Sequence, residues 1–169
     1  TIAGPEARAL AEQFGTPLYV VDEADARSRA ADTGAAFAGA FEPLGASTKV
    51  YYAGKAFLSA DVVRWMLEEG CAIDVCSEGE LALALAAGAP AALIGFHGNN
   101  KSTREIGIAV AAGVGAIVLD SAQELERVAA AAASAGRRQA VRLRVNSVVH
   151  ASTHEFLATS REDQKFGIP

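Results

Sequence analysis

The sequence has few cysteines and no apolar stretch long enough to cross a membrane. Its two cysteines, Cys71 and Cys76, lie five positions apart and form no CxxC pair, which argues against a metal site. We expect both thiols to be reduced and to belong to the core of a cytoplasmic protein. The longest apolar run, around residues 82–93, is interrupted by Gly88 and Pro90, so the sequence predicts no membrane-spanning segment.

Other marks of known protein classes are also missing. Positive charge is not in excess, since 15 lysines and arginines face 20 aspartates and glutamates, and this argues against nucleic acid as a partner. The glycines show neither a GxGxxG nor a Walker spacing, so they predict no nucleotide phosphate cradle. The first residues show neither a positively charged n-region nor an apolar h-region, so no export signal is visible in them. The sequence starts at Thr1 without a methionine, which indicates that residues have been removed or that the chain is a piece of a longer protein.

Apolar residues are abundant and follow a repeating order. With 169 residues, 51% of them hydrophobic, the chain is long enough for one domain with a stable core. Short apolar strands are predicted at 49–54, 71–76, 92–96, 115–119 and 140–145. Helices are predicted between them at 58–69, 78–87, 102–112 and 122–135, each closed by a glycine. Upstream, the pattern predicts a helix at 5–15, a strand at 18–21 and a long helix from the N-cap Asp22 to about Phe41.

The alternation of strands and helices predicts an α/β fold with a parallel sheet. The strands end at Lys55, Ser77, Asn100, Asp120 and Asn146, at intervals of 20 to 26 residues. Two architectures have this rhythm: an open, flavodoxin-like doubly wound sheet, and the first part of a TIM-like (β/α)8 barrel. Chain length favours the open sheet. In both architectures the functional side chains lie at the carboxyl ends of the strands.

Lys55 follows an apolar strand and has two interpretations. Lysines are mostly exposed, so the first is an ordinary solvated strand end. The second is an amine desolvated at the top of a sheet, which is neutral often enough to form a Schiff base with a carbonyl group. Asp74 lies inside another apolar strand, where an unpaired carboxylate is costly, and Arg144 is its expected partner.

The remaining polar residues at the strand ends have local explanations. Ser77 and Ser102 occupy positions typical of helix N-caps, and Glu80 follows Ser77 by three residues, as in a capping box. His97, taken alone, is more typical of a hydrogen-bonded loop histidine than of a catalytic residue. A lysine beside two opposite charges in a parallel sheet is still the set of groups that a charged cofactor would need.

Six short segments, taken in order, resemble one enzyme family. The segments are Tyr52–Phe57, Asp74–Leu81, His97–Ser102, Leu143–Asn146, Thr153–Phe156 and Asp163–Gly167. Together they resemble the diaminopimelate decarboxylases of the actinobacterial type, within the alanine-racemase-like (fold-type III) group of pyridoxal-phosphate enzymes. The resemblance runs through nearly the whole chain.

The resemblance implies a fold and a cofactor. Such enzymes fold as a (β/α)8 barrel followed by a C-terminal β-sandwich. The chain is therefore expected to form about five βα units of the barrel, with residues 1–22 beside the absent sandwich domain and residues 23–169 as the N-terminal half of the barrel. By resemblance, Lys55 is the catalytic lysine that forms a Schiff base with pyridoxal 5'-phosphate (PLP), and no metal is expected. The other expected cofactor-binding residues are Asp74, Glu80, His97 and Arg144.

The resemblance also implies an activity. The family removes a carboxylate from meso-2,6-diaminopimelate, giving L-lysine and CO2, in the last step of lysine biosynthesis. We therefore expect a small amino-acid substrate and a cytoplasmic homodimer for the full-length enzyme. Residues 98–101 are expected to line the barrel mouth, and residues 165–167 to lie near the dimer interface. Further motifs of the family would lie beyond Pro169, so the chain alone is expected to be inactive.

Three alternatives stay open at this point. The first is another fold-type III decarboxylase, acting on ornithine, arginine or another diamine precursor. The second is a non-catalytic, flavodoxin-like domain that binds a small anion, with Lys55 as a point charge. The third is a catalytically dead homologue that binds and regulates a partner, against which the intact Lys55 argues.

Overall fold

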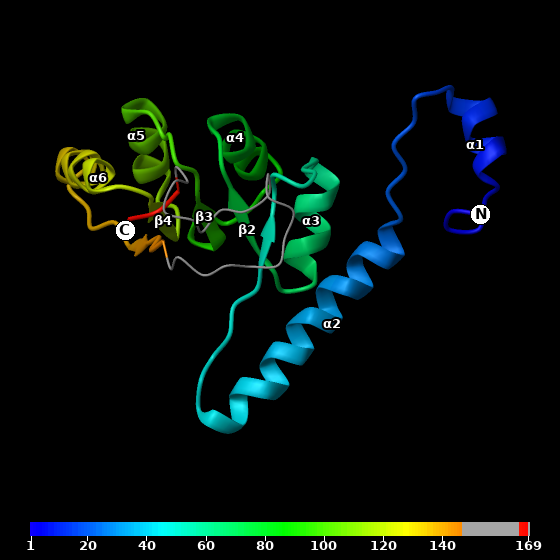
Figure 1. Cartoon of the computed structure of the whole chain (residues 1–169), viewed down its shortest axis with the longest axis horizontal. Coiled ribbons are helices and arrows are strands. Elements are labelled where there is room, and N and C mark those ends of the chain that lie inside the picture. The colour runs from blue at the N-terminus through cyan, green and yellow to red at the C-terminus, as the bar shows by residue number, and fades with distance from the viewer. Residues whose placement is uncertain (147–165, 169) are drawn as a thin grey trace.

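The structure is a computed structural model, and it describes residues 1–146 and 166–168. Its centre is a five-stranded parallel sheet in which each strand pairs with the next one in the sequence (Figure 1). The strands are β1 (Tyr51–Ala53), β2 (Ala72–Val75), β3 (Ile94–Phe96), β4 (Ala116–Leu119) and β5 (Val141–Leu143). This sequential order is that of a barrel wall, whereas a flavodoxin-like sheet reorders its strands. The barrel prediction is confirmed, and the open sheet that chain length favoured is wrong.

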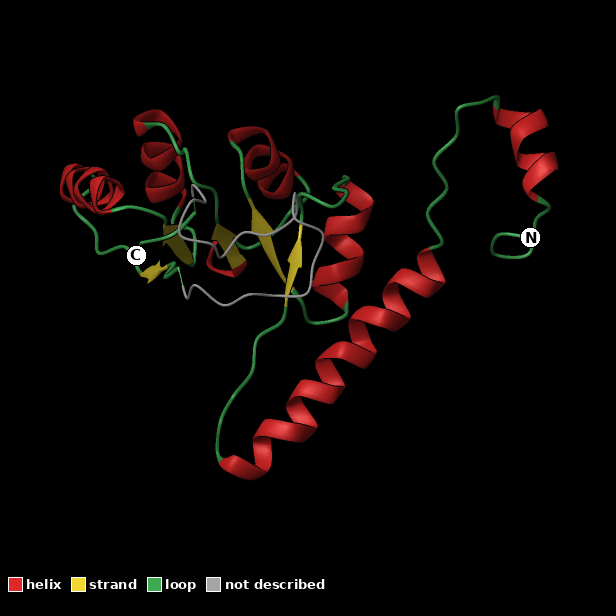
Figure 2. Ribbon diagram, viewed as in Figure 1, coloured by secondary structure: helices red, strands yellow, loops and turns green. Residues whose placement is uncertain are grey.

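Six α-helices accompany the sheet in the described part of the chain (Figure 2). They are α1 (Ala7–Phe14), α2 (Glu23–Phe41), α3 (Ala60–Glu68), α4 (Glu78–Ala86), α5 (Thr103–Ala112) and α6 (Ala122–Ser134). Two 3-10 turns, Glu42–Leu44 and Ala91–Leu93, precede β1 and β3. The predicted helices are therefore confirmed, with ends that differ by one or two residues.

Each helix from α2 to α6 begins at a side chain that accepts a backbone hydrogen bond. Asp22 accepts the N–H of Asp25 at 3.1 Å. A serine does the same before each later helix, at positions 59, 77, 102 and 121. Such caps satisfy N–H groups that have no partner inside the helix. The helix starts are thus encoded locally, which is why the sequence pattern located them.

The predicted strand at 18–21 is wrong. These residues lie in an extended stretch between α1 and α2 that pairs with no described strand, and the Tyr19 side chain is 94% exposed. An apolar run becomes a strand only where another strand can accept its hydrogen bonds. In Figure 1 this stretch and α1 lie away from the sheet.

The core lies on one face of the sheet. Alternate residues of the strands are fully buried there, namely Ile73, Val75, Ile94, Phe96, Ile117 and Leu119. The helices α3 to α6 stand in chain order along this side in Figure 1 and cover it. The other face carries none of the described helices, so its side chains are free to line a site.

Helix α2 is attached to the rest mainly through α3. The guanidinium of Arg27 contacts Glu68 at 2.6 Å and Glu69 at 2.8 Å. In α2, only Ala30 is buried. A cavity of about 590 Å³ separates the N-terminal half of α2 from β1, and its lining is largely apolar.

Candidate active site

The site is built on the face of the sheet that the helices leave uncovered. Strand register places Ala53, Asp74, Gly95 and Ala116 side by side on four neighbouring strands. Successive side chains of a strand point to opposite faces, so these four residues face away from the buried core. The polar residues expected from the sequence follow at the carboxyl ends of the same strands.

Lys55 lies in the turn directly after β1 and is exposed. Among the described residues it makes no hydrogen bond or ion pair. The desolvated lysine considered from the sequence is therefore not what this chain contains; the amine is open to solvent and to a ligand. The preceding Gly54 holds this turn close to β2, because its N–H donates to the Asp74 carbonyl at 2.8 Å. A Cβ at position 54 would lie 2.9 Å from that oxygen, so a larger residue would push the lysine turn away.

Asp74 pairs with His97 rather than with Arg144. Its Oδ2 lies 3.3 Å from Nδ1 of the imidazole. The predicted pairing with Arg144 is wrong, because Arg144 has a nearer carboxylate at the end of β4. The other ring nitrogen of His97, Nε2, is shielded from solvent and has no hydrogen-bond partner among the described residues. It is thus a shielded polar atom whose hydrogen-bonding capacity is unused among the described residues.

Glu80 ties the end of β2 to the start of α4. Its Oε2 accepts the N–H of Cys76 at 2.8 Å, and its own N–H donates to Ser77 Oγ at 3.2 Å. The predicted capping box therefore differs in one contact, since the Glu80 carboxylate bonds to the N–H of Cys76, the residue before the N-cap Ser77. Burial raises the pKa of the Cys76 thiol, and the charges of Glu80 and Asp74 raise it further.

Lys55 opposes this shift and lowers the Cys76 pKa. The lysine and the two carboxylates therefore lie close enough to influence one half-buried thiol. Cys76 itself belongs to the lining of the site more than to the core, contrary to the expectation from its sequence context.

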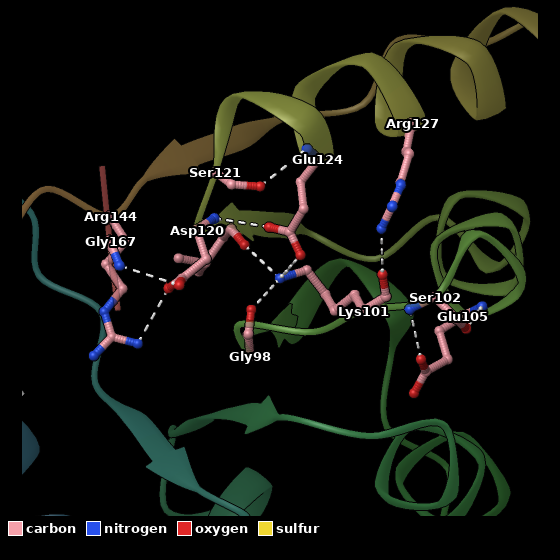
Figure 3. Close-up of polar contacts among 11 residues, drawn as sticks. Gly98, Lys101, Ser102, Glu105, Asp120, Ser121, Glu124, Arg127, Arg144 and Gly167 are labelled. Atoms are coloured by element: carbon pink, nitrogen blue, oxygen red, sulfur yellow. Dashed lines mark hydrogen bonds and ion pairs between the residues drawn. The ribbon is translucent and has the colours of Figure 1, made fainter. Parts of the chain in front are cut away.

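Arg144 pairs with Asp120 at the ends of β5 and β4. Its Nη1 donates to Asp120 Oδ1 at 3.2 Å, and its guanidinium lies 4.4 Å above the ring of Phe166. The second oxygen of Asp120 accepts the N–H of Gly167 at 3.1 Å (Figure 3). Arg144 is only partly engaged by these contacts, because 26% of its side chain stays exposed.

A contact that the sequence analysis missed crosses this face from β5 to β1. Arg142 Nη2 donates to the hydroxyl of Tyr51 at 2.8 Å, and the guanidinium lies 4.7 Å from the centre of the ring. The Tyr51 ring lies beside Gly95, where a Cβ would come within 3.2 Å of it and 3.3 Å of Asp74 Oδ1. Alternation placed Tyr51 on the face of Lys55, but its partner could not be read from the sequence.

Lys101 differs from its expected role. The loop 98–101 was expected to line the barrel mouth, yet Lys101 turns inward and is only 2% exposed. Its ammonium lies among backbone carbonyls and the carboxylate of Glu124 (Figure 3). The predicted segments at 153–156 and 163–165 lie outside the described residues.

The described residues offer neither a metal site nor a membrane-spanning helix. They contain no cluster of three histidine, cysteine, aspartate or glutamate side chains that could hold a metal ion. In the same residues, every helix is too short or too polar to cross a membrane.

Comparison with known proteins assigns the family. The family model for the pyridoxal-dependent decarboxylases, pyridoxal binding domain, matches residues 31–169. The chain belongs to this family. The membership confirms PLP as the cofactor that was predicted from the resemblance.

The relatives include curated diaminopimelate decarboxylases. The enzyme of Mycobacterium tuberculosis (strain ATCC 25618 / H37Rv) is 52% identical over 99% of this chain, and that of Bacillus subtilis (strain 168) is 43% identical over 98%. The chain spans only 36% and 37% of the length of these two relatives.

Solved structures agree on the fold. A diaminopimelate decarboxylase of M. jannaschii, in complex with L-lysine, has a TM-score of 0.82 and 34% identity, and the match covers 98% of this chain and 38% of that one. A lysine/ornithine decarboxylase of Vibrio vulnificus, complexed with putrescine, has a TM-score of 0.62 and 29% identity, over 85% of this chain and 36% of that one.

The described side chains fit PLP, which is an aromatic aldehyde with a phosphate group. An exposed lysine amine can react with an aldehyde, and Lys55 is exposed and makes no hydrogen bond or ion pair with another described residue. The shielded, unpartnered Nε2 of His97 can bond to a polar group of a ligand in the same region. The site therefore offers both a covalent and a polar attachment point.

Proposed function

We propose that the protein decarboxylates meso-2,6-diaminopimelate to L-lysine and CO2, the last step of lysine biosynthesis. The observation that carries this proposal is the 52% identity with the M. tuberculosis diaminopimelate decarboxylase over 99% of the chain. Among solved structures, the diaminopimelate decarboxylase of M. jannaschii also matches better, with a TM-score of 0.82, than the lysine/ornithine decarboxylase of V. vulnificus, with a TM-score of 0.62. The substrate is accordingly an amino acid with a second amino and carboxyl group at its far end.

In this proposal Lys55 holds PLP through a Schiff base. The exposed position of its amine supports the role, since the cofactor and the substrate must both reach it. When bound, PLP serves as the electron sink for the pair of electrons left behind as CO2 departs. The proposed cofactor environment comprises Asp74, Glu80, His97 and Arg144.

Asp74 and His97 act as one unit. If Nδ1 of the neutral imidazole donates to Asp74 Oδ2, then Nε2 is the unprotonated nitrogen and accepts a hydrogen bond. Asp74 thereby fixes both the tautomer and the orientation of the ring. Glu80 acts less directly, because its carboxylate is held by the Cys76 N–H and contributes negative charge near Lys55.

The test is chemical labelling of the lysine. PLP is added to this chain and to the protein as purified from its source, called the natural-length protein below. Absorbance is recorded, borohydride reduces any Schiff base, and peptide mass mapping locates the label. We expect the label on Lys55 in the natural-length protein, its loss in Lys55→Ala and its retention in Lys49→Ala, a matched exposed lysine. A label on a different lysine, or none, would contradict the role of Lys55.

A second candidate is a decarboxylase of ornithine, lysine or arginine. It draws support from the lysine/ornithine decarboxylase of V. vulnificus, whose structure matches with a TM-score of 0.62. The two candidates separate in one assay, in which CO2 release is measured from diaminopimelate, ornithine, lysine and arginine in turn. Release from diaminopimelate alone is expected.

We also propose a cytoplasmic homodimer for the natural-length protein. The division into residues 1–22 and 23–169 stays a prediction of the same kind. Light scattering coupled to size-exclusion chromatography measures the oligomeric state, and a mass of one protomer would contradict the dimer.

A further inference from the structure

Lys101 is the most deeply buried cation among the described residues. Its side chain is 1% exposed, and its Nζ donates to the carbonyls of Gly98 and Val118, the latter at 2.8 Å. Nζ also lies 3.1 Å from Oε1 of Glu124, whose side chain is 4% exposed. The two opposite charges offset each other, but Glu124 Oε1 accepts no hydrogen bond. All the partners of Lys101 are thus protein groups, and no ligand can reach its ammonium.

Glu124 extends the network to the end of β4. Its Oε2 accepts the N–H of Asp120 at 2.7 Å. Asp120 in turn accepts from Arg144 Nη1 at 3.2 Å and from the Gly167 N–H at 3.1 Å. Figure 3 shows this continuous chain of contacts from Gly98 through Lys101 to Arg144.

The network joins the carboxyl ends of three neighbouring strands. His97 and Gly98 follow β3, Asp120 follows β4, and Arg144 follows β5. Gly98 is adjacent to His97, which bonds to Asp74, so one end of the network borders the proposed cofactor site. Arg144, at the other end, belongs to the same proposed site.

A buried ion pair is a costly way to obtain stability. Well-packed apolar residues of similar volume often serve as well or better, since removing two charges from water costs several kcal/mol per ion. A lysine whose ammonium donates to two backbone carbonyls does something that an apolar residue cannot, because it fixes the loop at Gly98 and the strand at Val118 at a defined distance from each other. The pair is therefore better explained by geometry than by stability.

We propose that Lys101 and Glu124 are positioning residues, which hold His97 and Arg144 at fixed places in the cofactor site without contacting the ligand. The inference rests on the proposed function, since it takes those two residues as cofactor-binding. In this proposal, Lys101 and Glu124 are buried because they hold residues of the site in place. The proposal also explains why the last residue of the 97–101 loop turns away from the mouth.

The test compares Lys101→Met, Glu124→Gln and the double variant in the natural-length protein. Lys49→Met, at an exposed lysine, is the matched control. Three quantities are measured: the dissociation constant and absorbance maximum of PLP, the midpoint of urea unfolding, and the NMR resonance of the His97 imidazole. Lys101→Met should raise the PLP dissociation constant by about ten- to a hundredfold, the size of loss seen for outer-shell partners of metal ligands.

The double variant separates position from stability. Removing Lys101 alone leaves the Glu124 charge buried and unpaired, so the unfolding midpoint should fall, and neutralising Glu124 should restore part of it. Glutamine can still accept the Asp120 N–H, but no donor then reaches the carbonyls of Gly98 and Val118. PLP binding and the His97 resonance should therefore stay altered in the double variant, while Lys49→Met changes neither.

The outcomes discriminate between the two proposals. PLP affinity that recovers together with the unfolding midpoint would overturn the positioning role and leave a structural one. If the unmutated protein binds no PLP, the proposed function fails. The His97 resonance then still decides the inference: an unchanged resonance in Lys101→Met and in the double variant overturns it, and a shifted one supports it. Should Lys101→Met not fold, the double variant and Glu124→Gln supply the same comparison.

Discussion

The two faces of the sheet differ in what surrounds the same strands. On the helix-covered face, side chains such as Ile73, Phe96 and Leu119 are fully buried. On the other face, Asp74 lies between two of these buried residues and Arg144 follows β5, and their side chains are 21% and 26% exposed. One set of strands thus supplies both a dry core and a polar site.

The difference shows that alternate residues of one strand can serve two purposes, packing on one face and ligand binding on the other. Because neighbouring residues point to opposite faces, a polar residue can enter the sequence of a strand without entering the core. Asp74 lies between two fully buried neighbours, Ile73 and Val75, and does not disturb them. Changes on the helix face should therefore affect stability, and changes on the other face should affect ligand binding.

The largest expected effect on stability comes from the helix face. Phe96→Ala should lower the free energy of unfolding of the natural-length protein by about 3–5 kcal/mol, because it removes a fully buried ring and leaves a cavity. Tyr51→Phe, on the other face, keeps its ring and loses only the hydroxyl contact with Arg142. It should cost about 1 kcal/mol. Urea unfolding measures both, and equal losses would contradict the division between the faces.

A smaller effect on stability, but a distinct one on the site, is expected at Gly95. In Gly95→Ala the new methyl group would crowd Tyr51 and the Asp74 carboxylate, at 3.2 and 3.3 Å. The crowding and the gain in backbone rigidity partly offset each other, so stability should change by about 1 kcal/mol or less. The His97 resonance should shift, because its partner Asp74 must move.

A second glycine provides the control for this change. Gly107 lies within α5, and a Cβ there would meet no atom within 4 Å. Gly107→Ala should therefore stabilise the protein by about 1 kcal/mol through helix propensity and leave His97 unchanged. A site that tolerates alanine at position 95 without any shift in His97 would show that Asp74 is not confined by this glycine.

The most local effect concerns the start of α5. Ser102 and Glu105 form a capping box, in which each side chain accepts a backbone N–H of the other residue. Ser102→Ala should cost about 1 kcal/mol. The Ser102 N–H lowers the pKa of the Glu105 carboxyl below its ordinary value. The contribution of the Glu105 carboxylate to stability is therefore complete at neutral pH and is lost as the pH falls through that lowered pKa.

The pH dependence can be checked by urea unfolding between neutral and acidic pH. Glu105→Gln should remove the part of the acid destabilisation that this carboxyl contributes, while Glu126→Gln, on the next helix, serves as a control at a glutamate outside the box. The same acid profile in Glu105→Gln and in the unmutated protein would contradict the role of the box.

Local patterns in the sequence predicted most of the elements. The helix starts at Ser77 and Ser102 depend on a cap and its neighbours within one turn, and such contacts are visible in a few consecutive residues. The predicted strand at 18–21 failed because a strand, unlike a helix cap, depends on a partner strand that can lie anywhere in the chain. The predicted partner of Arg144 was wrong for a similar reason. Asp74 and Asp120 are both aspartates, and only the fold decides which of them lies near Arg144.

The sequence by itself determined the order of strands and helices and the family, and it singled out Lys55 as the proposed Schiff-base lysine, because these depend on local periodicity and on short ordered motifs. Tertiary structure alone decided which charges meet. Lys101 was expected at the mouth of the site and is buried, and Arg142 reaches Tyr51 across 91 positions of sequence. Such contacts follow from the register and curvature of neighbouring strands, which bring together residues that no local pattern connects.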